Sequence, residues 1–368
     1  MDRLQRVLDV VAERIDTPAP LVLLDVMRRN IDGMQGFAAQ HGLRLRPHVK
    51  THKCVEIGRL QMEAGAAGIT VGNLGEAEVF ARAGFADIFL AYPLWPGGTK
   101  GERVRRLAAT TRFRVGVDNV AAIEALADAM GEEPERLEVV VEVDCGARRS
   151  GAPPDVAGDL ALAARKRGLV PVGVYTYPGH GGSDRAAREP AARDQRAALL
   201  ATVRSFAGVG ITAEMVSAGS TPTVEFSTGG VITEIRPGEY VFYDLDNYRL
   251  GACIEDQIAL FVAATVVSDW VPGQVILDAG TKALGREGGP ENGFGGILGG
   301  RAVLSKLNEY HGFLAVPHAG SRPGVGTVVP VVPNHVCPVV NNFEELVVTD
   351  STGMTLDRWP VAARGLLG

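Results

Sequence analysis

The sequence lacks the features that mark secreted and membrane proteins. Its 368 residues include only four cysteines, and these form no CxxC pair. Sparse, widely separated cysteines favour free thiols in a reducing compartment. The longest apolar run, residues 258–267, is too short for a membrane-spanning helix, which needs about 20 residues. Residues 1–14 mix acids and bases and contain no secretory hydrophobic segment, so we expect a cytoplasmic protein.

Positive charge is also scarce. The 37 Lys and Arg residues are outnumbered by 43 Asp and Glu residues, which gives a net charge of -6. The basic residues form no block, whereas nucleic-acid binding needs concentrated positive charge. We therefore expect no nucleic-acid or membrane partner. Hydrophobic residues make up 46% of the chain, which is ordinary for a globular protein with a large core.

The first two thirds of the chain alternate short aliphatic runs with segments of helical period. Alternating strands and helices imply a parallel sheet. Eight such units in about 200–250 residues predict a (β/α)8 barrel of the TIM type, and an open doubly wound sheet is the structural alternative. The eight strand-like runs are residues 21–25, 43–50, 68–72, 87–92, 113–118, 137–144, 169–178 and 213–220.

The alternation ends after about Tyr240. From Ile258 onward, strand-like runs are joined by turns rich in Gly and Pro, with no long helical period between them. This pattern predicts a separate all-β domain. The expected organisation is a barrel over residues 1–250 and a β domain over residues 251–368. A helix within residues 1–16 is expected to pack on either domain.

Polar and titratable residues gather at the ends of the predicted barrel strands, where barrels of this type hold their active sites. The segment RPHVKTHK ends the second strand. Strand alternation places Lys50 on the face of Arg46 and His48. Neighbouring cations and semi-buried walls favour the neutral amine, which is a nucleophile toward carbonyl groups. A solvated basic edge is the structural alternative.

Two further motifs suggest ligand sites. The run SAGSTPT, residues 217–223, offers backbone N–H groups and small hydroxyls that suit a phosphate, although a plain turn has the same composition. In VVPNHVCPVV, His335 and Cys337 are two residues apart and would face the same way on a strand. One imidazole and one thiolate suit Zn²⁺, with water, substrate or another residue completing the tetrahedron. A core cysteine beside an edge histidine is the alternative.

Taken together, these motifs resemble the fold-type III pyridoxal-phosphate enzymes, and in particular the D-threonine aldolase and D-serine dehydratase family. The resemblance runs over nearly the whole chain and in the family's order. It implies a barrel with a β domain, a homodimer, pyridoxal 5'-phosphate as cofactor and a divalent metal, with Zn first and Mn or Mg as alternatives. The segments that carry it are RPHVKTHK, VDCGARRSG, SAGSTPT, IRPGEY and PNHVCP.

The resemblance also implies roles for single residues. Lys50 matches the family's Schiff-base lysine, with Lys53 as its competitor, and His335 and Cys337 match a pair of metal ligands. His180 is our candidate for the base at the substrate hydroxyl or for a water-holding group, a turn histidine being the alternative. The expected cofactor contacts are Arg149 at the phenolic oxygen, Tyr175, Tyr177 or Arg236 at the pyridine nitrogen, and Gly219, Ser220, Thr221, Gly238 and Tyr240 at the phosphate.

The implied activity is that of a lyase acting on D-β-hydroxy amino acids. The expected reaction is retro-aldol cleavage to glycine and an aldehyde, and the alternative is elimination to a 2-oxo acid and ammonia. The His-x-Cys form favours the dehydratase, while the overall pattern favours the aldolase. An amino-acid racemase would need a second base opposite Lys50 and would have no use for a metal pair. A non-catalytic pyridoxal-phosphate-binding protein would be a single barrel.

Overall fold

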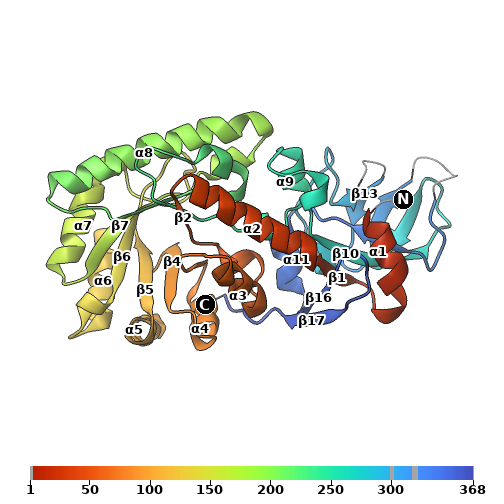
Figure 1. The fold of residues 1–368 in the computed structure, drawn as a ribbon, viewed down its shortest axis with the longest axis horizontal. Coiled ribbons are helices and arrows are strands. Elements are labelled where there is room, and N and C mark those ends of the chain that lie inside the picture. Colours follow the sequence, from red (N-terminus) through yellow and green to blue (C-terminus); the bar gives the residue numbers. More distant parts are fainter. Residues whose placement is uncertain (1–2, 299–301, 317–321, 368) are drawn as a thin grey trace. The chain divides into compact units, whose positions relative to one another are not determined.

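The computed structural model describes residues 3–298, 302–316 and 322–367, and its chain divides into two compact units (Figure 1). We call them the barrel unit and the sheet unit, and each consists of several separate segments of the sequence. This division differs from the expected boundary near residue 250, because residues from the start of the chain pack with the C-terminal part. The barrel unit consists of Gly33–Lys50, Ile57–Gly238 and Gly365–Gly368, and the sheet unit of Met1–Asp32, Thr51–Glu56 and Glu239–Arg364.

The barrel unit contains eight parallel strands in one sheet, which confirms the expected barrel class. The two end strands of this sheet are connected by a parallel bridge between His48, which follows the strand at residues 44–45, and Thr70, which lies in the strand at residues 69–71. The sheet therefore closes on itself. The strand order is β2 (Arg44–Leu45), β9 (Glu234–Ile235), β8 (Met215–Ala218), β7 (Val170–Tyr175), β6 (Glu138–Glu142), β5 (Arg112–Val117), β4 (Asp87–Pro93) and β3 (Ile69–Val71).

One of the eight segments predicted as barrel strands does not belong to the barrel. Residues 21–25 form the end of β1 (Ala19–Leu23) and the start of α2 (Leu24–Gln40), and β1 lies in the sheet unit. Every residue of β1 is buried, a pattern that barrel strands share with the central strand of any covered sheet. The eighth barrel position belongs to β9, whose two residues are too few to show a periodic pattern.

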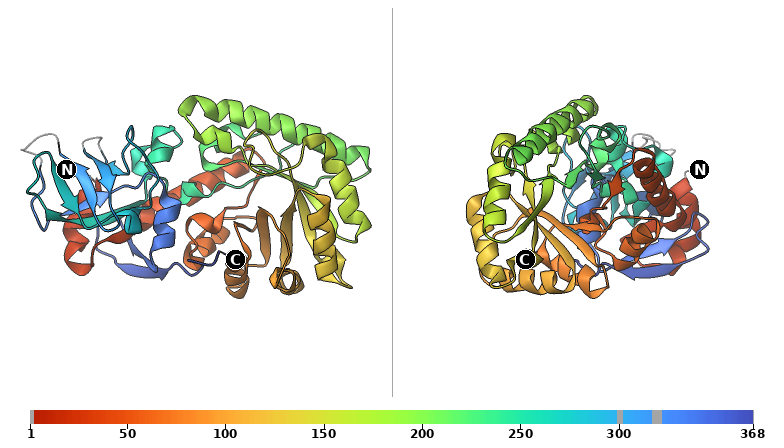
Figure 2. Two further views of the ribbon diagram at one scale, coloured as in Figure 1. Left: turned by 180° about the vertical axis from the view of Figure 1, so that it is seen from behind. Right: turned by 60° about the vertical axis from the view of Figure 1, so that its left-hand side comes forward.

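Helices separate the barrel strands and lie outside them (Figures 1 and 2). Two of them begin at Asn caps directly after a strand or turn: the Asn73 side chain accepts from the Glu76 N–H, and that of Asn119 accepts from the Ala122 N–H. The helices are α3 (Val55–Glu63), α4 (Leu74–Arg82), α5 (Lys100–Thr110), α6 (Val120–Met130), α7 (Ala157–Lys166) and α8 (Arg188–Gly208).

The barrel unit buries paired charges as well as an apolar core. The Arg46 Nε donates to Glu234 at 2.9 Å, and the Arg114 Nε lies 2.6 Å from Glu138. Both guanidinium groups also pair with Asp87. Because each buried charge has an opposite partner, the cost of removing it from water is offset.

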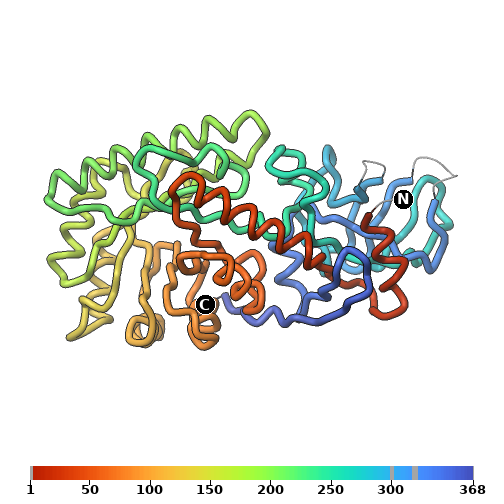
Figure 3. The backbone as a smooth tube through the Cα atoms, in the orientation of Figure 1, coloured from red at the N-terminus to blue at the C-terminus, as the bar shows by residue number. Residues whose placement is uncertain are grey.

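The sheet unit is built on a mixed nine-stranded sheet that includes β1 near the start of the chain. Figure 3 allows the path of β1 to be followed beside the C-terminal strand with which it pairs in parallel. The strand order is β12 (Gly296–Ile297), β13 (Ala302–Leu307), β14 (Gly312–Ala315), β11 (Gln274–Leu277), β10 (Leu260–Ser268), β1, β16 (Glu345–Thr349) and β17 (Asp357–Pro360), with β15 (Val328–Val331) also on β10.

Short helices complete the sheet unit. The first helix, α1 (Arg3–Val11), packs here, and its Gln5 side chain donates to the Val328 carbonyl at 3.1 Å. The others are α9 (Leu245–Arg249), α10 (Thr281–Leu284) and α11 (Val336–Asn342). Among the residues that the structure describes, no helix combines the length and apolar composition needed to cross a membrane.

Candidate active site

Lys50 follows a strand that is shorter than expected. β2 ends at Leu45, and Lys50 lies in a 3₁₀ turn over Val49–Thr51. The ladder continues as far as His48, whose N–H donates to the Pro237 carbonyl at 3.0 Å, and the chain then turns. The strand alternation that was expected to run through Lys50 is therefore wrong, because Lys50 lies in this turn. Lys50 is nevertheless exposed at the carboxyl end of this strand. A Cβ added at Gly72 would lie 3.7 Å from the Lys50 Cβ, so the end of β3 leaves room beside the lysine.

Arg46 does not border Lys50 as a free cation. Only 2% of Arg46 is exposed, and its guanidinium is bound to Glu234 and Asp87 within the barrel unit. The expected cluster of cations around Lys50 is therefore not formed by this residue. Lys53 was the alternative candidate for the lysine that binds the cofactor. Its ammonium group donates to the Asn341 side chain at 2.9 Å within the sheet unit.

Arg149, Tyr175 and Tyr177 gather at the ends of β6 and β7. The Arg149 guanidinium lies 4.7 Å from the centre of the Tyr177 ring and 3.6 Å from the Glu142 carboxylate. The Tyr175 hydroxyl donates to Glu142 at 3.1 Å, and Ser150 donates to the same carboxylate at 3.0 Å. Burial raises the pKa of Glu142, and burial beside Glu142 raises the pKa of Tyr175 well above its ordinary value. Tyr175 therefore remains a neutral hydrogen-bond donor.

Arg236 lies against Tyr175 and keeps one donor unused. Its Nη2 donates to the Thr176 carbonyl at 2.9 Å, and its guanidinium carbon lies 5.2 Å from the centre of the Tyr175 ring. The Nη1 atom is buried and has no hydrogen-bond partner among the described residues. An orphaned buried donor fits an acceptor that is not part of the chain, such as a ring nitrogen.

The expected phosphate residues form a tight turn after β8. Gly219 adopts a φ of +82°, which glycine tolerates best, and Ser220 caps the 3₁₀ segment Thr221–Phe226. The Gly219 N–H donates to Gln195 at 2.8 Å, and the Ser220 N–H donates to the Thr223 hydroxyl at 3.3 Å. A phosphate at this turn would therefore share or displace existing acceptors.

The remaining two expected phosphate residues belong to different units. Gly238 is buried in the barrel unit. It lies two residues after Arg236, whose N–H donates to the Ala218 carbonyl at 2.9 Å. Tyr240 is fully buried in the sheet unit, within a 3₁₀ turn over Glu239–Val241. The structure thus brings Gly238 to the same strand ends as the turn after β8.

His180 lies in a 3₁₀ turn, Gly179–Gly182, after β7. Its Nε2 is 3.2 Å from the Asp194 carboxylate on α8, and its buried Nδ1 has no partner among the described residues. The ring leaves little space at Gly146, where an added Cβ would be 3.1 Å from the His180 Cε1. The nearby Cys145 thiol is buried, which raises its pKa to about 11. Asp194 thus orients the imidazole, and the absence of a side chain at Gly146 leaves room for it.

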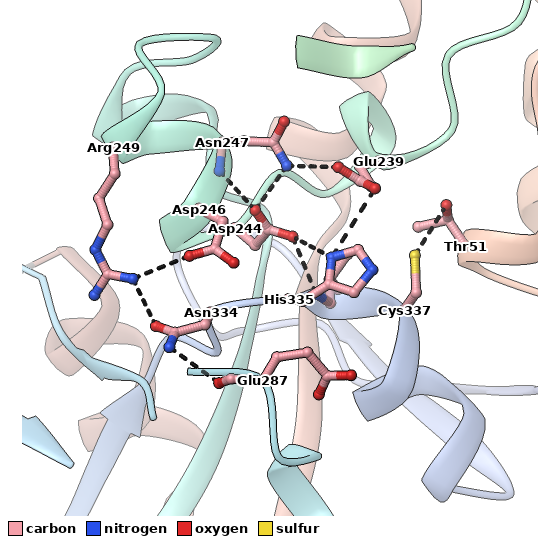
Figure 4. Close-up of polar contacts among 11 residues, drawn as sticks. Thr51, Glu239, Asp244, Asp246, Asn247, Arg249, Glu287, Asn334, His335 and Cys337 are labelled. Carbon is pink, nitrogen blue, oxygen red and sulfur yellow. Dashed lines mark hydrogen bonds and ion pairs between the residues drawn. The ribbon is translucent and has the colours of Figure 1, made fainter. Parts of the chain in front are cut away.

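His335 and Cys337 come together in the sheet unit, although not on a strand. His335 precedes α11 and Cys337 lies in its first turn, so the expectation of a shared strand face is wrong. Their ligand atoms and a Glu239 carboxylate oxygen all lie within 4.8 Å of one another (Figure 4). The Cys337 thiol is also 3.4 Å from the Thr51 hydroxyl. Nitrogen, sulfur and oxygen donors at this spacing suit a tetrahedral ion with one open position.

The electrostatics of this cluster favour a cation. Burial lowers the pKa of His335, but the charges of Cys337 and Glu239 and the hydrogen bond with Asp244 outweigh it and raise the pKa to about 12. Negative groups therefore converge on one imidazole. Glu239 was missed as a donor in the sequence because it lies far from PNHVCP along the chain, and the motif IRPGEY suggested only backbone contacts.

Comparisons with known proteins agree with this architecture. The protein-family model described as "Alanine racemase, N-terminal domain" matches residues 22–246, and the family model of a serine dehydratase domain matches residues 259–349. Over 364 residues, the chain is 36% identical to a D-threonine aldolase of Arthrobacter sp., covering 96% of this chain and 93% of the relative. It is 34% identical over 371 residues to a D-threo-3-hydroxyaspartate dehydratase of Delftia sp., covering 94% and 97%.

A solved structure gives the same result. The D-threonine aldolase from Filomicrobium marinum superposes with a TM-score of 0.88 at 30% identity, over 96% of this chain and 97% of that one. Both domain models, both relatives and this structure point to one group of enzymes. The chain belongs to the alanine racemase-like family, in the branch of the D-threonine aldolases and D-serine dehydratases.

Proposed function

We propose that this chain is a pyridoxal-phosphate- and metal-dependent lyase for D-β-hydroxy amino acids, with retro-aldol cleavage as its main reaction. The observation that carries the proposal is the donor set of Glu239, His335 and Cys337 in a member of this family. A racemase has no step that needs a metal at the β-position. Elimination to a 2-oxo acid and ammonia is the second candidate, because a relative named as a dehydratase is nearly as similar as the aldolase, at 34% against 36% identity.

The barrel unit offers the residues that would hold the cofactor, which supplies an electron sink for the substrate's Cα. Lys50 presents an exposed amine for the aldehyde carbon, whereas the Lys53 ammonium is bound to Asn341. Arg149 would bind the phenolic oxygen. For the pyridine nitrogen the contacts favour Arg236 over Tyr175, because Arg236 retains an unpaired N–H while the Tyr175 hydroxyl serves Glu142.

The other expected cofactor contacts follow from the same strand ends. The turn of Gly219, Ser220 and Thr221 with Gly238 would hold the phosphate, and Tyr177 would support Arg149 through its ring. Tyr240 stays a proposed phosphate contact that rests on the family resemblance. The homodimer likewise rests on that resemblance, whereas the cytoplasmic location is proposed from the four widely separated cysteines.

The sheet unit offers the metal donors, and a metal there would act as a Lewis acid on the β-hydroxyl. His335 and Cys337 would be the main ligands and Glu239 the third, and Zn²⁺ suits this mixed N, S, O set best. Mn²⁺ and Mg²⁺ prefer oxygen donors, which makes them weaker candidates.

Two residues of the barrel unit would move protons. The Lys50 amine would take or return the proton at Cα. The His180 imidazole, oriented by Asp194 at 3.2 Å, would accept the proton of the β-hydroxyl. If His180 takes the hydroxyl proton first, the Cα–Cβ bond would break, the aldehyde would leave, and a proton returned to Cα would complete glycine. If Lys50 removes the Cα proton first, the hydroxyl would leave with a proton as water, and hydrolysis of the remaining enamine would give the 2-oxo acid and ammonia.

The proposal is tested by incubating the purified protein, supplied with pyridoxal phosphate, with D-threonine in the presence and absence of a chelator. Glycine and acetaldehyde are expected, and both should disappear with the chelator and return with added Zn²⁺. Formation of 2-oxobutanoate and ammonia would assign the protein to the dehydratase reaction. Turnover that survives complete metal removal would contradict the role of Glu239, His335 and Cys337.

A further inference from the structure

Asp244 is a fully buried carboxylate next to the candidate metal donors, with 0% of its surface exposed. We propose that Asp244 is the positioning residue of the metal site: it orients the His335 ring so that Nε2 faces the ion, and through Asn247 it holds Glu239. The inference rests on the proposed metal-dependent function. It concerns a residue that would touch neither metal nor substrate.

The first half of the inference comes from the Oδ2 atom of Asp244. This oxygen lies 3.3 Å from the His335 Nδ1 and accepts the Val336 N–H at 3.1 Å. In Figure 4 the other ring nitrogen of His335 points toward the sulfur of Cys337. Metal-bound histidines commonly donate their second ring N–H to a carboxylate, which fixes the tautomer. Asp244 would therefore keep the proton on Nδ1 and leave the Nε2 lone pair available.

The second half comes from the Oδ1 atom. It accepts two hydrogen bonds from Asn247, from the backbone N–H at 2.9 Å and from the side-chain amide at 2.7 Å. The same amide also donates to the Glu239 carboxylate at 2.8 Å. One amide group thus joins two carboxylates, and both Glu239 and His335 are held in place through Asp244.

Helix capping alone does not account for Asp244. Its Oδ1 caps α9 through the Asn247 N–H and its Oδ2 accepts the first N–H of α11, so capping uses one bond to each oxygen. The Oδ2 atom also faces the His335 Nδ1 at 3.3 Å, a contact that neither helix end requires. A charged acceptor is useful here because it binds the Nδ1–H of a histidine more strongly than a neutral one does.

The test compares Asp244→Asn with Asp246→Asn in the full-length protein. Both variants lose one negative charge in the same turn, but the Asp246 carboxylate binds Arg249 at 3.1 Å instead of His335. Zn²⁺ affinity is measured by competition with a chelating dye, and the unfolding temperature is measured on the metal-free proteins. Co²⁺ is then added to report thiolate coordination through its charge-transfer absorbance.

We expect Asp244→Asn to weaken Zn²⁺ binding by about 10- to 100-fold, the effect typical of losing an outer partner of a metal-bound histidine. Its metal-free unfolding temperature should fall less than that of Asp244→Ala, because the amide oxygen still accepts from Asn247 although the amide nitrogen cannot accept the Val336 N–H. The Co²⁺–thiolate band should survive at saturation because Cys337 remains. Asp246→Asn should bind Zn²⁺ normally.

Three results would overturn the inference. The first is unchanged Zn²⁺ affinity in Asp244→Asn. The second is an equal loss of affinity in both variants, which would reveal a general charge effect. The third is a drop in unfolding temperature as large as that of Asp244→Ala, which would make the residue structural. If the unchanged protein binds no Zn²⁺, the metal part of the proposed function fails as well, so the two failures are distinguishable.

Discussion

The two halves of the candidate chemistry are built in opposite ways. The proposed metal donors of the sheet unit are held by polar contacts: Asp244 and Asn247 hydrogen-bond with His335 and Glu239. Lys50 of the barrel unit is exposed on a short 3₁₀ turn after a two-residue strand. One group is fixed by several hydrogen bonds, and the other presents an exposed side chain.

This difference matches what each group is proposed to do. A metal ligand must keep its geometry, because affinity and selectivity depend on fixed donor positions. A lysine that binds the cofactor, releases it to the substrate and then transfers a proton must reach several positions in one cycle. The comparison implies that changes at Lys50 affect the chemistry with little effect on stability, while changes around His335 act first on metal binding.

The largest effect is expected from Lys50→Ala. Loss of the amine should reduce turnover of D-threonine by about 10²- to 10⁴-fold, the range for removal of a general base. The visible absorbance band of a lysine-bound cofactor should also disappear, whereas the unfolding temperature of the cofactor-free protein should barely change because Lys50 is exposed. Lys53→Ala serves as the control and should retain the band. Persistence of the band in Lys50→Ala would move the cofactor lysine elsewhere.

The next effect is expected from Cys337→Ala, which removes a proposed ligand and leaves its supports in place. Zn²⁺ affinity should fall by more than the about 10- to 100-fold expected for loss of an outer partner. The Co²⁺–thiolate band should be absent, which separates this variant from Asp244→Asn. Cys145→Ala is the matched control, since this buried thiol lies in the barrel unit. Equal metal affinity in both cysteine variants would exclude Cys337 as a ligand.

The fold was largely predictable from the sequence because strand–helix alternation is a local signal. The failures came where local patterns have more than one solution. The fully buried β1 has the composition of a barrel strand but pairs with β10 and β16. β9 has two residues and therefore shows no periodicity, yet it fills the eighth barrel position.

The candidate site was predictable where its residues share a short motif and not where they meet through the fold. His335 and Cys337 were paired from their spacing, but the reason given was wrong, because a helix start and not a strand brings them together. Glu239 and Asp244 carry no motif of their own as metal residues. They become visible only when the chain after β9 returns beside α11, as the hydrogen bond from the Val336 N–H to Asp244 shows.

The smallest effect is expected from Gly146→Ala, which probes the orientation of His180 and not a reacting group. Gly146 has a φ of +121°, and an added Cβ would lie 3.1 Å from the His180 Cε1. Strain at such a position costs about 1–3 kcal/mol. A displaced imidazole should lower turnover by about tenfold, less than the roughly 100-fold that a 1 Å misplacement can cause.

Gly84→Ala provides the control for this last change. Gly84 also has a positive φ, +92°, but an added Cβ there would meet nothing within 4 Å. Both variants should therefore lose stability in thermal unfolding, while only Gly146→Ala should lose turnover. Because the metal donors belong to the sheet unit, Zn²⁺ affinity should be unchanged in both. An equal loss of turnover in the two variants would mean that backbone strain alone lowers activity and that the orientation of His180 has no catalytic role.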